Sequence, residues 1–352
     1  MRKTHLTFLL LIFCSGAFAQ LGGSYSFGFV NIDPTARTAA LGSSLLADFG
    51  NDIGTAYHNP STLNPKMNNM AALSYNNYLA DINSGFAGYV KTIKNFGTMS
   101  GTMTYNDYGY FDKTDETGAI IGRFWANDYI FQVGYGNVWQ QDDRFTYGIN
   151  FKFLYSVYEK YVATAFAFDF AGAYHDTARL FDMAGIVRNL GYNVIPYQDI
   201  RVDLPLDLQF GISKKLKHNP LKFTAVAHNL QRFDISYVNT NARNKNIDLE
   251  TGEVLNQKVS FGDKMMRHLN VGAELVFSDN FQVRGGYNHQ RRKELAGETY
   301  KGSAGFSWGL GIAIKKFKLD YAMVTYFPGL NVNYITVSKN LSDFKRAKPE
   351  NY

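Results

Sequence analysis

A two-residue alternation of apolar and polar positions runs along most of the chain, from about residue 70 to residue 338. In residues 145–156 the odd positions are aromatic or aliphatic, and every even position except Leu154 is Thr, Gly, Asn, Lys or Ser. Because successive side chains of a strand point to opposite faces, this pattern predicts strands with one apolar face. The polar positions are rich in Gly, Ala, Ser and Asn rather than in charges, which favours a membrane barrel over a soluble sandwich.

The alternation divides into about fourteen strands, with a range of roughly 12 to 16, each long enough to cross a bilayer at about 9–11 tilted residues. The predicted fold is therefore all-β, an antiparallel transmembrane β-barrel formed by residues 70–340, with an N-terminal segment plugging the lumen. The strands are predicted to begin near Met70, Ser84, Thr98, Arg123, Arg144, Tyr161, Phe181, Asp203, Leu221, Arg267, Phe281, Gly302, Lys316 and Asn331.

The connections between these strands alternate between tight turns and longer segments. The longer ones are residues 112–122, 191–202, 231–266 and 291–301. Outer-membrane barrels keep short turns in the periplasm and longer loops outside. We therefore expect both termini in the periplasm and the long loops at the cell surface.

Strand parity also predicts which side chains face lipid and which face the lumen. A charge at the bilayer midplane costs roughly 2–4 kcal/mol for Arg or Lys, so charged positions should point inward. We expect Glu274 and Arg284 to form a lumen ion pair that holds the plug. The predicted lipid-facing set of the eighth strand is Leu204, Leu206, Leu208, Phe210 and Ile212. The predicted lumen-facing set is Asp203, Asp207, Gln209, Ser213, Asn270, Glu274, Gln282, Arg284, Asn288 and Gln290.

Residues 20–69 precede the first strand and do not alternate. Residues 38–49 are rich in Ala and Leu, and the preceding Asp33 and Pro34 suit the cap and first position of a helix. Residues 50–54 then predict a turn. A short helix of this kind cannot bury its apolar residues alone, so we expect the segment to fold back into the lumen.

The first residues predict a compartment. Arg2 and Lys3, a short apolar run and Ala17-Phe18-Ala19 form a secretory signal peptide over residues 1–19. The single cysteine, Cys14, lies within it, so the mature chain should have no disulfide or lipid anchor. Composition agrees with a barrel, since 16% aromatic residues and a mean hydropathy of -0.24 combine a lipid face with a polar lumen. The net charge of +6 is too mild for nucleic acid.

No catalytic or cofactor chemistry is evident in the sequence. A Gly-x-Ser-x-Gly elbow is absent, no cysteine nucleophile survives maturation, and the histidines lack metal-ligand spacing. We therefore expect a protein that is not an enzyme and carries no cofactor. Residues 341–352 are expected to form a periplasmic C-terminal tail.

Two runs of the N-terminal segment resemble a known family. Residues 34–42 read PTARTAALG and residues 56–63 read AYHNPSTL, which is similar to the N-terminal signature of the PorV/PorQ family of Bacteroidetes outer-membrane proteins. That family resembles the long-chain fatty acid transporters, which are fourteen-stranded barrels with an N-terminal plug. The residues that form the candidate plug motif are Pro34, Arg37, Ala40, Leu41, Gly42, Tyr57, Asn59 and Pro60.

The resemblance implies an integral outer-membrane component of the type IX secretion system of a Gram-negative, Bacteroidetes-type bacterium. It implies a place in the attachment complex, with a PorZ-like surface protein, a PorU-type sortase and a PorV-type barrel as partners. Outer-membrane lipid and lipopolysaccharide would surround the barrel. The barrel itself would anchor the surface partner near the sortase while cargo is attached.

The longest loops are the candidate docking surface for such a partner, because loops of this length are usually functional or disordered. Aromatic and aliphatic residues there are candidate anchors of an interface; alternatively, they extend strands above the membrane. They are Tyr192, Ile195, Tyr197, Phe233, Ile235 and Tyr237. The alternative function is FadL-like transport of hydrophobic small molecules, which requires a greasy cavity under the loops and a lateral opening in the wall.

Overall fold

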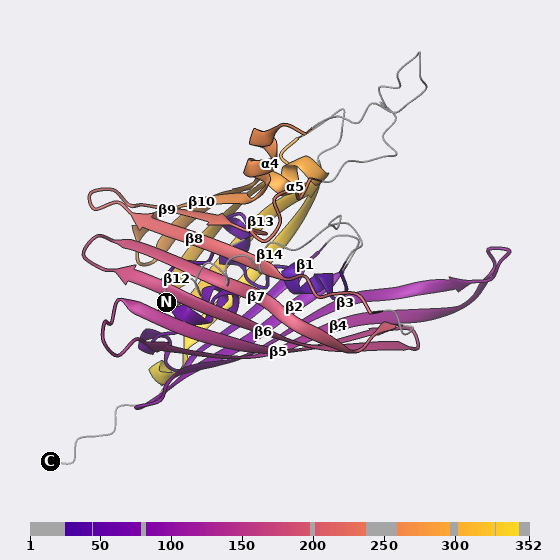
Figure 1. Cartoon of the computed structure of the whole chain (residues 1–352), viewed down its shortest axis with the longest axis horizontal. Coiled ribbons are helices and arrows are strands. Elements are labelled where there is room, and N and C mark those ends of the chain that lie inside the picture. Colours follow the sequence, from indigo (N-terminus) through magenta and orange to yellow (C-terminus); the bar gives the residue numbers. More distant parts are fainter. Residues whose placement is uncertain are drawn as a thin grey trace, which may run out of the picture.

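The computed structural model describes residues 25–43, 45–78, 82–197, 201–236, 259–295, 302–327 and 329–344. These residues form a closed barrel of fourteen antiparallel strands in which each strand pairs with its neighbours in sequence and β1 pairs with β14 (Figure 1). The predicted all-β fold, an antiparallel barrel of fourteen strands, is confirmed. The signal peptide predicted for residues 1–19, Tyr237 and residues 345–352 of the predicted tail lie outside the described ranges.

Every strand predicted from the alternation is present, and the largest difference between predicted and observed starts is four residues, at Asp203 against Asp207 and at Gly302 against Phe306. The strands are β1 Met70–Asn77, β2 Asn83–Ile93, β3 Gly97–Thr114, β4 Ile120–Val138, β5 Phe145–Tyr158, β6 Tyr161–Asp176, β7 Phe181–Ile195, β8 Asp207–Lys215, β9 Leu221–Ala227, β10 Leu269–Ser278, β11 Phe281–Asn288, β12 Phe306–Ile314, β13 Phe317–Phe327 and β14 Leu330–Asn340.

The helices are short and belong to the N-terminal segment, to the connections between strands or to the residues after β14. They are η2 Gly28–Asn31, α2 Ala36–Ala40, α3 Ile53–His58, η3 Pro60–Thr62, η4 Pro65–Met67, α4 Phe261–Arg267, α5 His289–Leu295 and η7 Leu341–Phe344. Within the described ranges, no helix has the length and apolar character needed to cross a membrane.

The two faces of β5 differ in polarity and in exposure. Phe145, Tyr147 and Phe151 are exposed on the outside, whereas the alternate side chains, such as Asn150 and Lys152, are buried inside the closed barrel. The outward faces of most other strands likewise expose Phe, Tyr, Trp, Ile, Leu or Val. An apolar exterior around a polar interior is what a transmembrane barrel requires.

The N-terminal helix differs from the prediction. Asp33 and Pro34 do not start it: α2 begins at Ala36 with Thr35 at the N-cap position, and it ends after five residues. Gly42 and Ser43 follow with φ of 86° and 69°, a left-handed conformation that a helix cannot continue through. The predicted turn at residues 50–54 instead leads into α3, which Asp52 caps by accepting a hydrogen bond from Gly54 N.

The prediction for the start of β8 is also wrong. Leu204 and Leu206 do not face lipid, because the strand begins only at Asp207. Pro205 has no N–H for a strand ladder, and Leu206 N donates instead to Leu204 O at 2.8 Å, which closes a tight turn around the proline. Leu204 consequently turns into the lumen and is buried.

All four predicted long loops contain strand or helix residues. β3 and β4 extend through most of residues 112–122 and form a ribbon that projects well beyond the neighbouring strands (Figure 1). β7 continues to Ile195, so Tyr192 and Ile195 belong to a strand. α4 and α5 occupy parts of the other two loops, and Gln290 lies in α5 rather than in β11.

Candidate functional site

The N-terminal segment, residues 25–69, lies in the barrel lumen. α2 contacts β11 to β14, α3 contacts β1 to β3, and η3 contacts β4 to β6. Only a segment inside the barrel can touch strands on all of these sides, and its indigo ribbon runs within the outline of the strands (Figure 1). This segment and the inner wall that receives it form the candidate functional site.

The N-terminal segment packs against glycines of the wall at two places, which we call glycine seats. The first faces α2 and the residues after it. A Cβ added at Gly286 would lie 2.2 Å from Gly42 N, and one added at Gly309 would lie 2.7 Å from the Cβ of Ala40. The backbone of the segment therefore approaches the wall more closely than any side chain would allow. Ser307 Oγ also donates to Ala40 O at 2.9 Å, which fixes the end of the helix to β12.

A second glycine seat receives η3. A Cβ at Gly136 would lie 2.4 Å from Pro60 O, and one at Gly148 would lie 2.4 Å from the carbonyl carbon of Pro60. Asn59 supports this turn, since its Oδ1 accepts a hydrogen bond from Ser61 N at 3.0 Å. The small inward residues that the alternation revealed thus mark where the segment meets the wall.

An ion cluster joins the segment to β9, β10, β11 and β13. Arg37 lies 2.6 Å from Asp48, 3.1 Å from Asp52 and 2.8 Å from Glu274. Glu274 also accepts from Arg284 Nε at 2.6 Å, so the predicted pair forms. The cluster balances four cations with four carboxylates: Arg37, Lys222, Arg284 and Lys318 with Asp48, Asp52, Glu274 and Asp320.

The carboxylates that the segment contributes to the ion cluster are held ionised. Burial alone would raise the pKa of Asp48, but the charges of Arg37 and Lys222 lower the pKa to about 2. Burial would also raise the pKa of Asp52, but the charges of Arg37 and Lys318, together with hydrogen bonds from Arg37 and Gly54 N, lower it. A buried ion cluster of this kind is costly to break on one side, because the remaining charges stay without partners.

A smaller polar cluster lies on the inner face of β5, β6 and β7. Lys152 Nζ lies 2.8 Å from Asp169 Oδ2 and donates to Asn189 Oδ1 at 2.9 Å. Asn150 donates to the same carboxylate at 2.9 Å. Lys152 was visible in the sequence as the charged residue on the inward parity of β5, but its partner on β6 was not.

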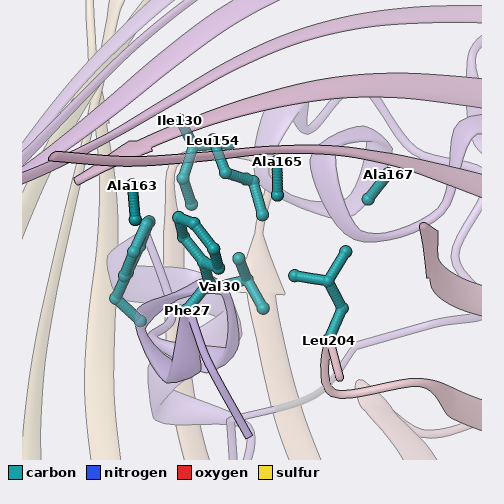
Figure 2. Close-up of a cluster of buried hydrophobic side chains, with 9 residues drawn as sticks. Phe27, Val30, Ile130, Leu154, Ala163, Ala165, Ala167 and Leu204 are labelled. Atoms are coloured by element: carbon teal, nitrogen blue, oxygen red, sulfur yellow. The ribbon is translucent and has the colours of Figure 1, made fainter. Parts of the chain in front are cut away.

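An apolar cluster fills the lumen beside these strands (Figure 2). Phe27 and Val30 of the segment and Leu204 approach Ile130 of β4 and Leu154 of β5. Leu154 was the exception in the alternation of β5, and it is apolar because it faces this cluster rather than the polar lumen. Alanines of β6 complete the cluster, namely Ala163, Ala165 and Ala167.

A cavity of about 450 Å³, here called the mouth cavity, lies at the loop end of the barrel. Residues of the segment, including Gly28 and Asn31, form one side of it. The rest of the lining comes from β7, from the start of β8, from the loop-side ends of β10 and β11 and from the adjoining loops, and is mainly polar. It includes Arg188, Asp207, Asn270, Asn288, Arg291 and Glu294.

The mouth cavity adjoins a seam in the wall. The hydrogen-bonded ladder between β7 and β8 ends at the pair Arg188–Asp207, although β7 continues to Ile195. Pro205 and Leu206, which leave the wall at this point, line the cavity together with that pair. The sequence signal for the seam was Pro205, a residue that cannot donate to a ladder.

The predicted site residues differ in where the structure places them and in how buried they are. All eight residues of the candidate plug motif lie in the lumen and are buried. Among the candidate docking residues, Tyr192, Ile195 and Phe233 are exposed, whereas Ile235 is buried and Tyr197 packs against the apolar cluster. Sequence analysis missed the ion-cluster members Asp48, Asp52, Lys222, Lys318 and Asp320, and the two arginines of the mouth cavity. Inward parity marked Asp320 and Arg188, but nothing near Asp320 in the sequence marked Arg284 as its partner.

The described residues contain no group of three or more His, Cys, Asp or Glu side chains that could hold a metal ion. No family model matches the sequence, and no curated protein matches it.

Solved structures share the fold. The toluene transporter TodX of Pseudomonas putida superposes with a TM-score of 0.53 and 9% identity, covering 88% of this chain and 99% of its own. A FadL homologue of Pseudomonas aeruginosa gives a TM-score of 0.50 and 10% identity, covering 87% and 98%. A TodX mutant lacking S2 and S3, a monoaromatic hydrocarbon channel, gives 0.51 and 9%, covering 87% and 99%. These likenesses show that the chain has the barrel fold of FadL-like outer-membrane transporters.

Proposed function

We propose that the protein transports small molecules across the outer membrane, and that the N-terminal segment plugs the lumen between transport events. The observation that carries this proposal is the mouth cavity. It is a small-molecule-sized space at the loop end that the segment closes on one side and that adjoins the β7–β8 seam. Pockets of about 300–1,000 Å³ are typical of small-molecule sites.

The fold supports the proposal, because the solved barrels with the same architecture include a toluene transporter. The seam supplies the second element that transport of the FadL kind requires, since unpaired backbone groups do not face lipid unless they border a cavity. The chemistry of the cavity differs from the greasy space required for purely hydrophobic molecules, because Asn270, Asn288 and the two arginines line it. The lining therefore favours polar molecules over hydrophobic ones.

Filling the mouth cavity should stop transport. Gly28 lines the cavity, and a Cβ at this position meets no atom within 4 Å, so the side chain of Gly28→Trp can leave the backbone without a clash and occupy part of the space. We expect uptake of glucose-sized solutes into proteoliposomes to fall roughly tenfold, because such a ring occupies much of a pocket of this class.

Gly101→Trp is the matched control, since Gly101 is exposed on β3 and its Cβ also meets no atom within 4 Å. Uptake should not change in this variant. Equal uptake by native chain and Gly28→Trp would contradict a route through the cavity. Running toluene beside glucose in the same assay separates hydrophobic from polar transport.

A second candidate function is the anchoring of a surface partner in a type IX attachment complex, with a PorZ-like protein near a PorU-type sortase and a PorV-type barrel. The resemblance of residues 34–42 and 56–63 supports it. So does a group of exposed apolar residues on loop-end elements: Tyr110, Ile120, Tyr192, Ile195 and Phe233. Exposed apolar surface of this extent above a membrane suits a protein interface.

Changing Ile195 and Phe233 together to Ser should release such a partner, because apolar anchors carry most of the binding energy of an interface. We expect a mild-detergent pull-down of the tagged native barrel from outer membranes to bring down a large surface protein and a transpeptidase. The double variant should bring down roughly tenfold less of both. Lipid-facing Phe306→Ser is the control. A native barrel that purifies alone would exclude this second function.

A further inference from the structure

The outer wall of the barrel carries a groove of about 570 Å³ near its turn end, which we call the outer groove. The turn end is the one opposite the β3–β4 ribbon (Figure 1). The groove crosses β5 to β8 on the face that is exposed to the surroundings, and most of its lining is apolar. It is separate from the mouth cavity, because none of its lining residues lines that cavity.

A pair of glycines forms the floor of the outer groove. Gly172 of β6 pairs with Gly185 of β7. Their neighbours in the same row are Tyr147 of β5 and Phe210 of β8. Residues directly opposite each other in a sheet share a face, so two positions without side chains lie between two outward rings. A Cβ added at Gly172 or Gly185 would meet one backbone oxygen of the described chain, at 3.9 Å or 4.0 Å. The floor is therefore open space that neighbouring side chains do not fill.

Aromatic side chains form the sides of the outer groove near the turn end. Trp139 packs edge to face against Tyr147, with ring centroids 6.0 Å apart. Phe145 packs against Tyr174 at 5.0 Å. Rings of Trp and Tyr gather where a transmembrane barrel meets the headgroups of the bilayer. The outer groove thus begins at the level of the membrane interface and continues along the wall into the hydrocarbon region.

The end of the outer groove at the turn between β4 and β5 is polar. Gln141 and Asp142 line it there. Arg144 Nη2 lies 2.6 Å from Asp142 Oδ2, and the guanidinium lies 5.7 Å from the ring centroid of Tyr174. Both members of this ion pair are accessible, with 55% of the Arg144 side chain and 28% of the Asp142 side chain exposed. A molecule in the groove therefore meets apolar surface along its length and one pair of opposite charges at its end.

These features match an amphiphile of the bilayer. Lipid covers the outer wall of a transmembrane barrel, and a groove left empty in that wall would deprive its lining atoms of dispersion contacts. Neighbouring strands are about 4.8 Å apart, so a floor of two glycines suits one flexible chain better than the broad wall of a second barrel. The paired charges of Arg144 and Asp142 are complementary to a headgroup that carries both a phosphate and an ammonium.

We propose that the outer groove binds one glycerophospholipid with a zwitterionic phosphoethanolamine headgroup. An acyl chain lies over Gly172 and Gly185, the phosphate faces Arg144, and the ammonium faces Asp142. The proposal does not depend on the transport function, because the groove is on the outer wall and not in the lumen.

Native mass spectrometry of the purified full chain with added lipid tests the proposal. The probe is dioleoyl phosphatidylethanolamine. Gly172→Leu and Gly185→Leu each fill the floor without a backbone clash. Each should weaken binding of the first lipid on the order of tenfold, because the leucine takes the place of methylene groups of the acyl chain. Circular dichroism shows whether each variant is folded.

Gly101→Leu is the matched control, since Gly101 is exposed on β3, away from the outer groove, and its Cβ meets no atom of the described chain within 4 Å. This variant should bind the first lipid as the native chain does. Equal affinity of the native chain and both folded groove variants would overturn the proposal. A native chain that dimerises while the groove variants stay monomeric would assign the groove to a second copy and would also overturn it.

The headgroup is tested with dioleoyl phosphatidylglycerol, which has the same acyl chains but an anionic headgroup without an ammonium. The native chain should prefer phosphatidylethanolamine by about threefold, a difference of the size expected for an exposed charge pair. Asp142→Asn removes the carboxylate that faces the ammonium, so the preference should shift toward phosphatidylglycerol. Tighter binding of phosphatidylglycerol by the native chain would contradict the zwitterionic headgroup.

Discussion

Gly286→Val is expected to expel α2 from its seat while the barrel remains closed. A Cβ at Gly286 would lie 2.2 Å from Gly42 N and 2.5 Å from the carbonyl carbon of Leu41, which are backbone atoms and cannot rotate away. Overpacking a filled core usually costs about 1–3 kcal/mol. Here we expect at least the upper end, because the clash is with the main chain.

The measurement is thiol labelling, since Cys14 of the predicted signal peptide is the only cysteine of the sequence. A cysteine at Ala39, which is fully buried in α2, should be protected from a membrane-impermeant maleimide in the native background. With Gly286→Val it should react roughly a hundredfold faster, because a loss of about 3 kcal/mol in the free energy that holds α2 against the wall raises the population of the open state by that factor.

Gly285→Val is the matched control, because it adds the same side chain one residue earlier on the same strand. Gly285 points to the opposite face, where a Cβ meets only Ser307 O at 3.9 Å. Protection of the cysteine at Ala39 should therefore persist. Equal labelling rates in the two valine variants would contradict a segment seated on Gly286.

Arg37→Met is expected to have the second large effect on the docking of the N-terminal segment, because it removes the cation that contacts three carboxylates of the ion cluster. Asp48, Asp52 and Glu274 would remain buried without this cation. Removing one partner of a buried ion pair typically costs about 3–5 kcal/mol. We expect the free energy of opening of α2, measured by hydrogen exchange, to fall by about that amount. Arg37→Lys should recover only part of the loss, because an ammonium keeps the charge but lacks the planar fork with which Arg37 Nε and Nη2 bind both oxygens of Glu274.

The effect of Arg37→Met should depend on pH with a defined sign. The folded-state pKa of Asp48 is lowered, to about 2 from 3.8. A lowered pKa stabilises the docked segment above the unfolded-state pKa, and the stabilisation is lost as pH falls through the folded-state value. Native docking should therefore be constant near neutral pH and weaken between about pH 4 and pH 2. The difference between native chain and variant should shrink over that range.

The control is Arg179→Met, which removes an exposed arginine whose partner Asp176 lies 3.7 Å away. Exposed pairs contribute about 0–1 kcal/mol, so exchange in α2 should not change. A constant difference between native chain and Arg37→Met from pH 7 to pH 2 would contradict the ion cluster as the cause.

The sequence predicted the wall of this protein well because alternation is a local property. Side chains at positions i and i+2 share a face, so each strand and its inward residues could be read without knowing its neighbours. The pairing of Glu274 with Arg284 was also within reach, because a tight turn joins their strands and sets them opposite each other. Beginning β8 at Asp203 failed because a proline turn overrides apolar alternation at Leu204 and Leu206.

The candidate site was predicted less completely because its contacts join distant residues. Arg37 and Glu274 are 237 positions apart, and nothing local to either names the other. The resemblance at residues 34–42 and 56–63 located the segment, but not its contacts: Ala40, Leu41, Gly42 and Pro60 fit against glycines of β4, β5, β11 and β12, which are distant in the sequence. Arg188 was on the inward face of β7, but the cavity that it lines forms only when distant strands and loops pack together.

Ion conductance in a planar lipid bilayer tests the central claim most directly, namely that the N-terminal segment closes the lumen of a small-molecule channel. The native full chain should conduct little, because residues 25–69 contact the wall on all sides. A chain lacking residues 25–67 should show large, steady conductance steps. A native chain that conducts as well as the shortened one, or a shortened chain that inserts and stays silent, would contradict the account.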